Sequence, residues 1–131
     1  MDWYDEQLVF PEDESFKTYN FSLDTVITHN VPDNFSFFLY NNIHFLNNEE
    51  VLLVSFKNIY KTNLKTNEST NIYSFGANNW WYRLDVSIDK KTMLLQKKDH
   101  IKYDDCTIHV RSYLSLLDID GTNERRILIP E

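Results

Sequence analysis

The sequence predicts a mainly β protein built from short antiparallel strands. Runs of β-branched and aromatic residues alternate with polar residues, which is the pattern of strands that bury one face. Stretches rich in Asn, Asp, Lys and Thr separate these runs, and Asn and Asp favour turns. Hydrophobic residues make up 42% of the 131 residues and aromatic residues 15%, which is enough for a packed core.

The strand candidates follow one another along the chain, and no linker or low-complexity segment divides them. They are residues 15–23, 35–40, 51–56, 71–75, 80–88, 93–96, 107–117 and 126–129. We therefore expect a single domain over residues 1–131 that begins with an acidic N-terminal segment, residues 1–14. The expected architecture is an antiparallel meander, a sandwich or a set of open blade-like sheets.

Residues 105–118 fit either a strand or one short helix. On a helix, Cys106, Val110 and Leu114 would share a face, with Asp105 as the N-cap. The Thr, Ile and Val residues of the same segment favour a strand. We expect a strand here, and this is the one place where a short helix is the alternative.

Two pairs of segments form a weak internal repeat. Residues 47–53 align with 89–95 at an offset of 42, and residues 59–68 align with 114–123 at an offset of 55. Residues 86–92 and 114–127 resemble the strands and polar turns of a TolB-like or WD-type β-propeller blade, and the resemblance extends over residues 43–129. It implies blade-like sheets, in which residues 114–127 would be the third strand, the turn and the fourth strand. A closed propeller needs about 4–8 blades of ~40 residues, so this chain has room for only two or three.

Charge is distributed unevenly along the chain, whose net formal charge is −7. Residues 1–56 hold ten Asp or Glu and one Lys, and residues 57–131 hold ten acidic and twelve basic residues. The negative field of the first part opposes nucleic-acid binding and favours a basic protein partner.

The protein is expected to be cytoplasmic. Its source is expected to be a bacterium or phage with an AT-rich genome. The first six residues are acidic and aromatic rather than basic, which is unlike a signal peptide. Cys106 is the only cysteine, and no apolar run reaches the ~20 residues of a membrane span. No membrane association is therefore expected.

No catalytic or metal-binding constellation is recognised, so no enzyme activity, cofactor or metal is expected. Cys106 and His109 would point to opposite faces of a strand, which argues against a thiol–imidazole pair. The acids and histidines at 99–109 lack zinc-ligand spacing. Asp118 and Asp120 resemble the start of a calcium loop, but its twelfth position is Ile129.

The most unusual stretch is the aromatic run at residues 80–83. On a regular strand Trp81 and Arg83 would share one face, opposite to Trp80 and Tyr82. Tryptophan, tyrosine and arginine are enriched in binding hot spots, and aromatic side chains can also stack on sugars.

We therefore expect a non-enzymatic protein-binding domain, in its most specific form an immunity or inhibitor protein that neutralises a basic toxin or nuclease. The candidate partner-binding residues are Asp2, Trp3, Tyr4, Asp5, Glu6, Glu12, Asp13, Glu14, Trp81 and Arg83. One alternative is a small-ligand or carbohydrate-binding β-domain that uses Trp80, Trp81 and Tyr82. Another is a phage or assembly protein in which blade-like segments pair between chains. The sequence does not determine the oligomeric state.

Overall fold

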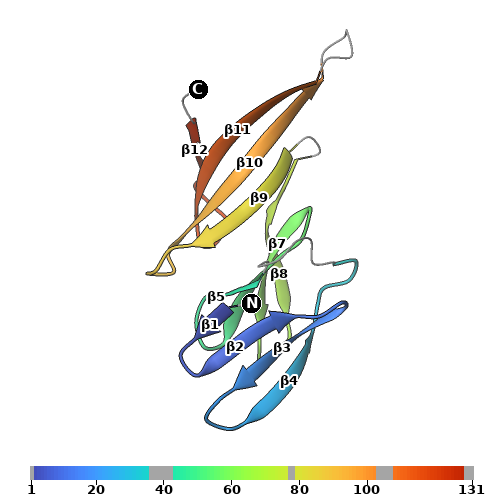
Figure 1. Ribbon diagram of the computed structural model, residues 1–131, viewed down its shortest axis with the longest axis vertical. Coiled ribbons are helices and arrows are strands. Elements are labelled where there is room, and N and C mark those ends of the chain that lie inside the picture. The colour runs from blue at the N-terminus through green and yellow to red at the C-terminus, as the bar shows by residue number, and fades with distance from the viewer. Residues whose placement is uncertain (1, 36–42, 77–78, 103–107, 129–131) are drawn as a thin grey trace. The chain divides into compact units, whose positions relative to one another are not determined.

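The computed structural model describes residues 2–35, 43–76, 79–102 and 108–128, and within them the protein is built from strands (Figure 1). Twelve strands form three four-stranded antiparallel sheets, and the chain passes through each sheet in sequence order. This confirms the predicted mainly β, antiparallel fold. The sheets are blade-like, and the described residues form no closed propeller. None of these residues lies in a helix that could cross a membrane.

The chain divides into two compact units, Met1–Ile72 and Tyr73–Glu131. The first unit begins with a sheet of β1 (Asp2–Tyr4), β2 (Gln7–Pro11), β3 (Ser15–Asn20) and β4 (Thr25–Asn30). Residues 2–11 of the acidic N-terminal segment are therefore the first two strands of a sheet. The register of β3 with β4 runs without interruption from the pair Ser15–Asn30 to the pair Asn20–Thr25.

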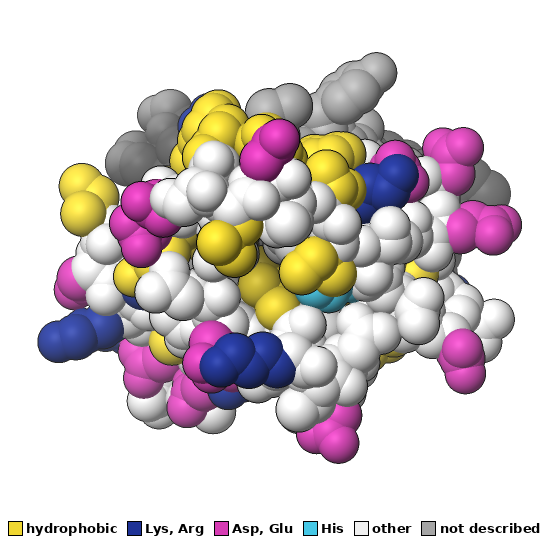
Figure 2. Space-filling model, turned by 90° about the horizontal axis from the view of Figure 1, so that it is seen from below, with side chains coloured by type: hydrophobic (Ala, Val, Ile, Leu, Met, Phe, Trp, Pro, Cys, Tyr) yellow, Lys and Arg dark blue, Asp and Glu magenta, His cyan; other side chains and the backbone are white. Residues whose placement is uncertain are grey.

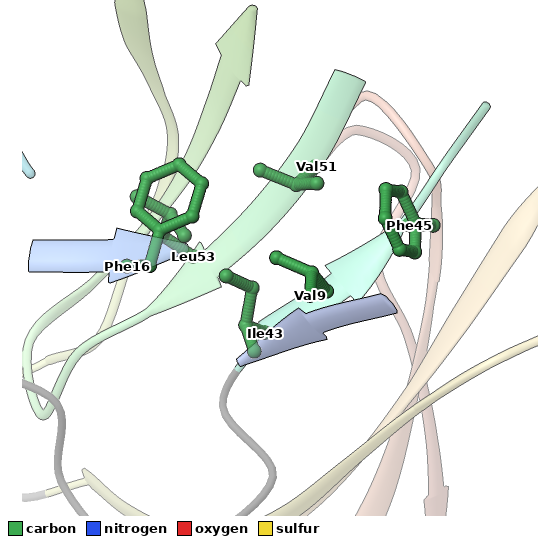
Figure 3. Packing of buried hydrophobic residues seen from close by; sticks show 6 residues of the cluster. All are labelled: Val9, Phe16, Ile43, Phe45, Val51 and Leu53. Atoms are coloured by element: carbon green, nitrogen blue, oxygen red, sulfur yellow. The ribbon is translucent and has the colours of Figure 1, made fainter. Parts of the chain in front are cut away.

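The second sheet contains β5 (Ile43–Phe45), β6 (Glu50–Val54), β7 (Asn58–Asn63) and β8 (Ser69–Ser74). An apolar core joins the first two sheets (Figure 3), and its six residues are fully buried: Val9, Phe16, Ile43, Phe45, Val51 and Leu53. The Asp2 carboxylate also accepts a 2.7 Å hydrogen bond from the Phe45 backbone N–H, which ties β1 to β5.

The third sheet lies in the second unit and contains β9 (Asn79–Val86), β10 (Thr92–Lys102), β11 (Ile108–Asp118) and β12 (Arg125–Leu128). Figure 1 shows β10 and β11 running side by side as its longest strands. Residues 108–118 are thus a strand. This is the structure expected there, and the short helix was the alternative. Residues 103–107, including Cys106, lie outside the described residues.

The three sheets share one turn design after their third strand. That strand ends in an Asx residue each time, namely Asn20, Asn63 and Asp118. The Asn20 and Asn63 side chains accept backbone N–H groups of the following turn, and Asp118 accepts the Asn123 amide. Another Asx residue with positive φ stands just before the fourth strand: Asp24, Asn67 and Asn123. Asn and Asp suit both roles because they bond to their own turn and tolerate the left-handed region.

The repeat at an offset of 42 residues also matches the structure. Its two copies place the start of β6 at Glu50 and the start of β10 at Thr92. Asn47 accepts a hydrogen bond from the N–H two residues later at 2.8 Å, and Asp89 does the same at 3.1 Å. The blade-like pattern of residues 43–129 therefore reflects a plan that the second and third sheets share. The first sheet follows the same plan.

Candidate functional site

The surface that stands out is the outer face of the first sheet. Cross-strand pairing places Trp3, Tyr19 and Val26 in one row, with Leu8 between Trp3 and Tyr19. The residues that alternate with this row, such as Val9 and Thr18, are buried. Because neighbouring residues of a strand point to opposite faces, the row faces away from the core. We call Trp3, Leu8, Tyr19, Phe21 and Val26 the aromatic face.

Phe21 completes this surface from the turn after β3. Its ring stacks on Trp3 with centroids 5.0 Å apart and an interplanar angle of 1°, and it meets Tyr19 edge-on at 4.8 Å. Trp3 is 59% exposed, Phe21 44% and Val26 56%. Large rings held rigidly against one another while still in contact with water are typical of binding anchors, since little side-chain entropy remains to be lost.

Acidic side chains surround one end of the aromatic face. Asp5 and Glu6 lie in the turn between β1 and β2, and Asp24 lies in the turn between β3 and β4. A backbone hydrogen bond of 2.9 Å from Phe21 N–H to Glu6 O joins these turns, and Ser22 donates to the Glu6 carboxylate. The Tyr19 hydroxyl donates to Asp24 at 2.6 Å, and this hydrogen bond raises the pKa of Tyr19.

Only one cation occurs in the first sheet, and it lies at the opposite end. Lys17 pairs with Glu12 at 2.8 Å, beside the turn that contains Asp13 and Glu14. With seven acidic residues against this one lysine, residues 1–30 carry a formal charge of −6. In the view of Figure 2, Asp and Glu side chains are spread over the surface with hydrophobic side chains between them.

The structure separates the eight predicted partner-binding residues of the N-terminal segment into three groups. Trp3, Asp5 and Glu6 come together at the aromatic face. Asp2 is engaged with Phe45, and the Tyr4 ring packs against the core with its centroid 6.0 Å from that of Phe45, so both stabilise the fold. Glu12, Asp13 and Glu14 line a shallow hollow at the far end of the sheet.

The side chains of Trp80, Trp81 and Tyr82 lie outside what the structure describes. The backbone register shows that Gln96 pairs with Arg83 while Lys97 pairs with Trp81, so β9 has one extra residue at this point. The strict alternation from which Trp81 and Arg83 were expected to share one face is therefore interrupted. The exposed Arg83 forms an ion pair of 2.9 Å with Asp85.

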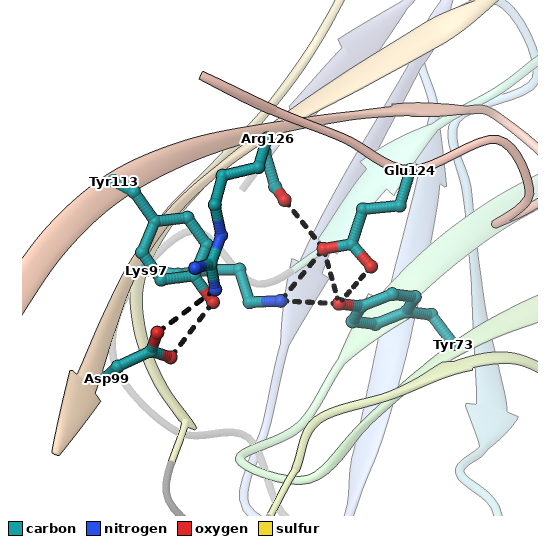
Figure 4. A network of polar contacts seen from close by, with 7 residues as sticks. Tyr73, Lys97, Asp99, Tyr113, Glu124 and Arg126 are labelled. Carbon is teal, nitrogen blue, oxygen red and sulfur yellow. Dashed lines mark hydrogen bonds and ion pairs between the residues drawn. The ribbon is translucent and has the colours of Figure 1, made fainter. Parts of the chain in front are cut away.

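A second concentration of polar groups lies inside the second unit, around Lys97 (Figure 4). The Lys97 ammonium is 2.5 Å from the Tyr73 hydroxyl and 3.0 Å from Glu124 Oε1. Ser115 donates to the same carboxylate oxygen at 2.6 Å. The rings of Tyr73, Phe75 and Tyr113 surround the ammonium, with centroids 5.1–5.8 Å away.

A second ion pair extends this network. Arg126 stacks over Tyr113 at 3.6 Å and pairs with Asp99 at 3.0 Å, while the Tyr113 hydroxyl donates to Asp99 at 3.1 Å. Each cation thus meets both an acid and an aromatic ring. The aromatic box resembles a site for a cationic ligand, but Lys97 itself fills it.

The pKa values agree with a fully ionised pair at neutral pH. Burial lowers the pKa of Lys97, but hydrogen bonds to Tyr73 and Glu124 outweigh it and raise the pKa overall. Burial raises the pKa of Glu124, and hydrogen bonds from Ser115 and Lys97 reverse this, so its pKa is lowered. Both shifts favour the charged forms of the two partners, so the network holds an ion pair within the second unit.

The remaining chemical candidates gain no site from the structure. Cys106 is outside the described residues, and within the described parts of the chain no three His, Cys, Asp or Glu residues gather as metal ligands do. His29 is 4% exposed, stacks on Phe16 with centroids 4.9 Å apart, and has its Nε2 atom 2.9 Å from the Thr18 hydroxyl. It is part of the core of the first unit.

Comparison with known proteins gives a fold likeness only. No family model and no curated protein sequence matches the chain. A solved oligogalacturonate lyase in complex with manganese is 12% identical with a TM-score of 0.65, and the match covers 87% of this chain and 33% of that one. An oligogalacturonate lyase from Vibrio parahaemolyticus is 14% identical with the same TM-score of 0.65, over 92% and 35% of the two chains.

The chain thus spans about a third of the length of these lyases. At 12–14% identity the likeness establishes a shared arrangement of strands. The lyase activity belongs to those proteins, and the manganese to the first of them.

Sequence reasoning identified Trp3, Asp5 and Glu6 but missed Tyr19, Phe21, Val26 and Asp24 as parts of the same surface. The signal was present in residues 15–23. Phe16 and Thr18 occupy one face of β3, whereas Tyr19 and Phe21 stand at the alternate positions, which point to the opposite face. Large apolar residues on both parities of a strand indicate that neither face is purely solvent-facing.

Proposed function

We propose that this chain is a non-enzymatic protein-binding domain that docks a basic protein surface on the aromatic face of its first sheet. The observation that carries the proposal is the exposed Trp3–Phe21 stack, with Asp5, Glu6 and Asp24 beside it. Stacked rings supply an apolar anchor, and the surrounding carboxylates attract a cationic partner and reject an acidic one.

In its most specific form, the proposal is an immunity or inhibitor protein for a basic toxin or nuclease. The formal charge of −6 on residues 1–30 would imitate the phosphates that such a partner binds and would accelerate association at low salt. This form predicts that a gene beside that of this protein encodes the basic partner. The small-ligand alternative stays a prediction, because the side chains of Trp80, Trp81 and Tyr82 lie outside the described residues.

The test measures binding of the basic protein encoded by the adjacent gene, by calorimetry at two salt concentrations. Trp3→Ala and Phe21→Ala should each weaken binding by about 30-fold or more, the loss typical of a hot-spot residue. Asp5→Asn together with Asp24→Asn should lower the association rate several-fold. These two changes preserve the turns, since both positions have positive φ and Asn tolerates it.

The matched control is Asp13→Asn with Glu14→Gln, which removes the same charge at the far end of the sheet. Screening at ~0.1 M salt acts over about 10 Å, so this control should bind nearly as the wild type does. If the control weakens binding as much as the Asp5 and Asp24 changes, the partner does not dock on the aromatic face. If the adjacent gene encodes no basic protein, the inhibitor form is wrong.

A further inference from the structure

A second exposed apolar surface lies on the third sheet. Tyr113, Ser115 and Leu117 are buried, so Leu114 and Leu116 point to the opposite face of β11. Leu114 pairs across the sheet with Ile127, and Leu116 pairs with Leu94. Ile127 is 44% exposed, and Val110 on the same face is 51% exposed. We call Leu94, Val110, Leu114, Leu116 and Ile127 the aliphatic face.

The charge around the aliphatic face differs in sign from that of the first sheet. By cross-strand register its described charged neighbours are Arg83, Lys98, Arg125, Asp85 and Asp118. They carry three positive and two negative charges. Counted over the whole segment, residues 79–128 hold nine basic and eight acidic residues, a formal charge of +1 against −6 for residues 1–30. Two aromatic faces would repel each other, whereas an aromatic and an aliphatic face would attract.

Face-to-face packing of sheets is already how the first unit is built. The inner face of the first sheet contributes Val9 and Phe16 to the same buried core as Phe45 and Val51 of the second sheet. Together, the two outer faces present the same two classes of residue as that core. Large aromatic rings lie on the first sheet, and aliphatic side chains lie on the third. An intermolecular contact between them would repeat a type of packing that the chain already uses.

We propose that a second copy of this chain is a partner of the aromatic face, and that it docks through its aliphatic face. This inference rests on the proposed function, because it uses the same surface and the same attraction for cations. The contact is head-to-tail, since the two copies contribute different surfaces. Such a contact leaves one aromatic and one aliphatic face open in every dimer, so association continues to longer arrays or closes into a ring.

The test blocks one face at a time. Trp3→Asp with Phe21→Ser removes the aromatic face, and Val110→Asp with Ile127→Asp removes the aliphatic face, and all four residues are exposed. Wild type should show a mass that rises with concentration by light scattering. Each blocked variant alone should be a monomer. An equimolar mixture should give a heterodimer of twice the monomer mass, because each variant keeps the face that the other has lost.

Ile88→Asp is the matched control. Ile88 is fully exposed in the turn between β9 and β10, so the change adds one negative charge outside both faces, the same number as the aromatic-face variant adds. It should associate as the wild type does. Circular dichroism of each variant establishes that the sheets remain intact.

A monomeric wild type, or a mixture that remains monomeric, would overturn the inference and leave the proposed function in place, provided that the basic partner still binds. A mixture that forms the heterodimer while the product of the adjacent gene fails to bind would have the opposite meaning. The self-association would then stand, and the inhibitor proposal would fall. Two blocked variants that each still associate would overturn the head-to-tail arrangement.

Discussion

The two units of this protein bury different kinds of residue. In the first unit, six fully buried apolar residues from two sheets form the core, and burial lowers the pKa of its buried imidazole, His29, which favours the neutral form. In the second unit, Met93, Leu95 and Leu117 share their face of the sheet with the buried ammonium of Lys97. The first core buries apolar and neutral polar side chains, whereas the second also buries a charged one. The difference teaches that one sheet plan tolerates both, provided that each buried charge has partners.

The largest expected effect tests the apolar core. Phe16→Ala should lower the free energy of unfolding of the first unit by about 3–5 kcal/mol, because the ring is fully buried and a cavity would remain. Phe21→Ala, which removes the same ring from the exposed face, should cost less than about 1 kcal/mol. Amide hydrogen exchange read by peptide assigns each loss to its unit. Equal losses for the two variants would contradict the assignment of faces.

A smaller effect is expected from Lys97→Met, which removes the ammonium while keeping the length of the side chain. Glu124 and Tyr73 would lose their donor, at a cost of about 2 kcal/mol in the second unit. The double variant with Glu124→Gln should cost less than the sum of the two single changes, because the charge left unpaired by one change is removed by the other. Unfolding in urea provides the four free energies. If Lys97→Met is neutral, the comparison between the cores fails, and apolar packing alone holds both.

The smallest expected effect concerns the pH dependence of stability, which should differ between the two units. Burial lowers the pKa of His29 below its ordinary value of 6.5, so the unfolded chain binds a proton that the folded chain does not. The first unit should therefore lose stability as the pH falls below about 6.5. The pKa of Glu124 is lowered from 4.5, so its contribution is present above that value and is lost only as the pH falls further, through the folded value.

The measurement is urea unfolding of each unit at about pH 7 and at about pH 5.5, either side of the ordinary His pKa. The first unit of the wild type should weaken over this interval, and the second unit should change less. His29→Gln has no titrating ring and should remove most of the difference in the first unit. An unchanged pH dependence in His29→Gln would show that another group is responsible.

Much of the fold could be predicted because strand patterns are local. The alternation in residues 15–20, the continuous apolar run at residues 51–54 and the repeat at an offset of 42 translate directly into strands and turns. For residues 108–118 the apolar residues fit both the helical and the strand period, and only the β propensity of Thr, Ile and Val favoured the strand. The pairing of β11 along the length of β10 confirms the strand, and such pairing depends on residues distant in sequence.

The candidate site was less predictable for the same reason. An acidic first part with Trp3 could be read from the chain, but the stack on Phe21 depends on two turns that meet across the sheet. In the same way, the sequence shows Lys97 as one more lysine, directly after the strand predicted at residues 93–96. Only the cross-strand positions of Tyr113 and Ser115, with Tyr73 and Glu124 from distant segments, turn it into the centre of a buried network.

By itself, therefore, the sequence determined the class of fold, the common turn design and the polarity of charge, because each depends on neighbours along the chain. The tertiary structure alone decided which rings are anchors, which acids stand beside them and which charges are buried. Those properties depend on register and sheet packing, which bring together residues that no local pattern connects.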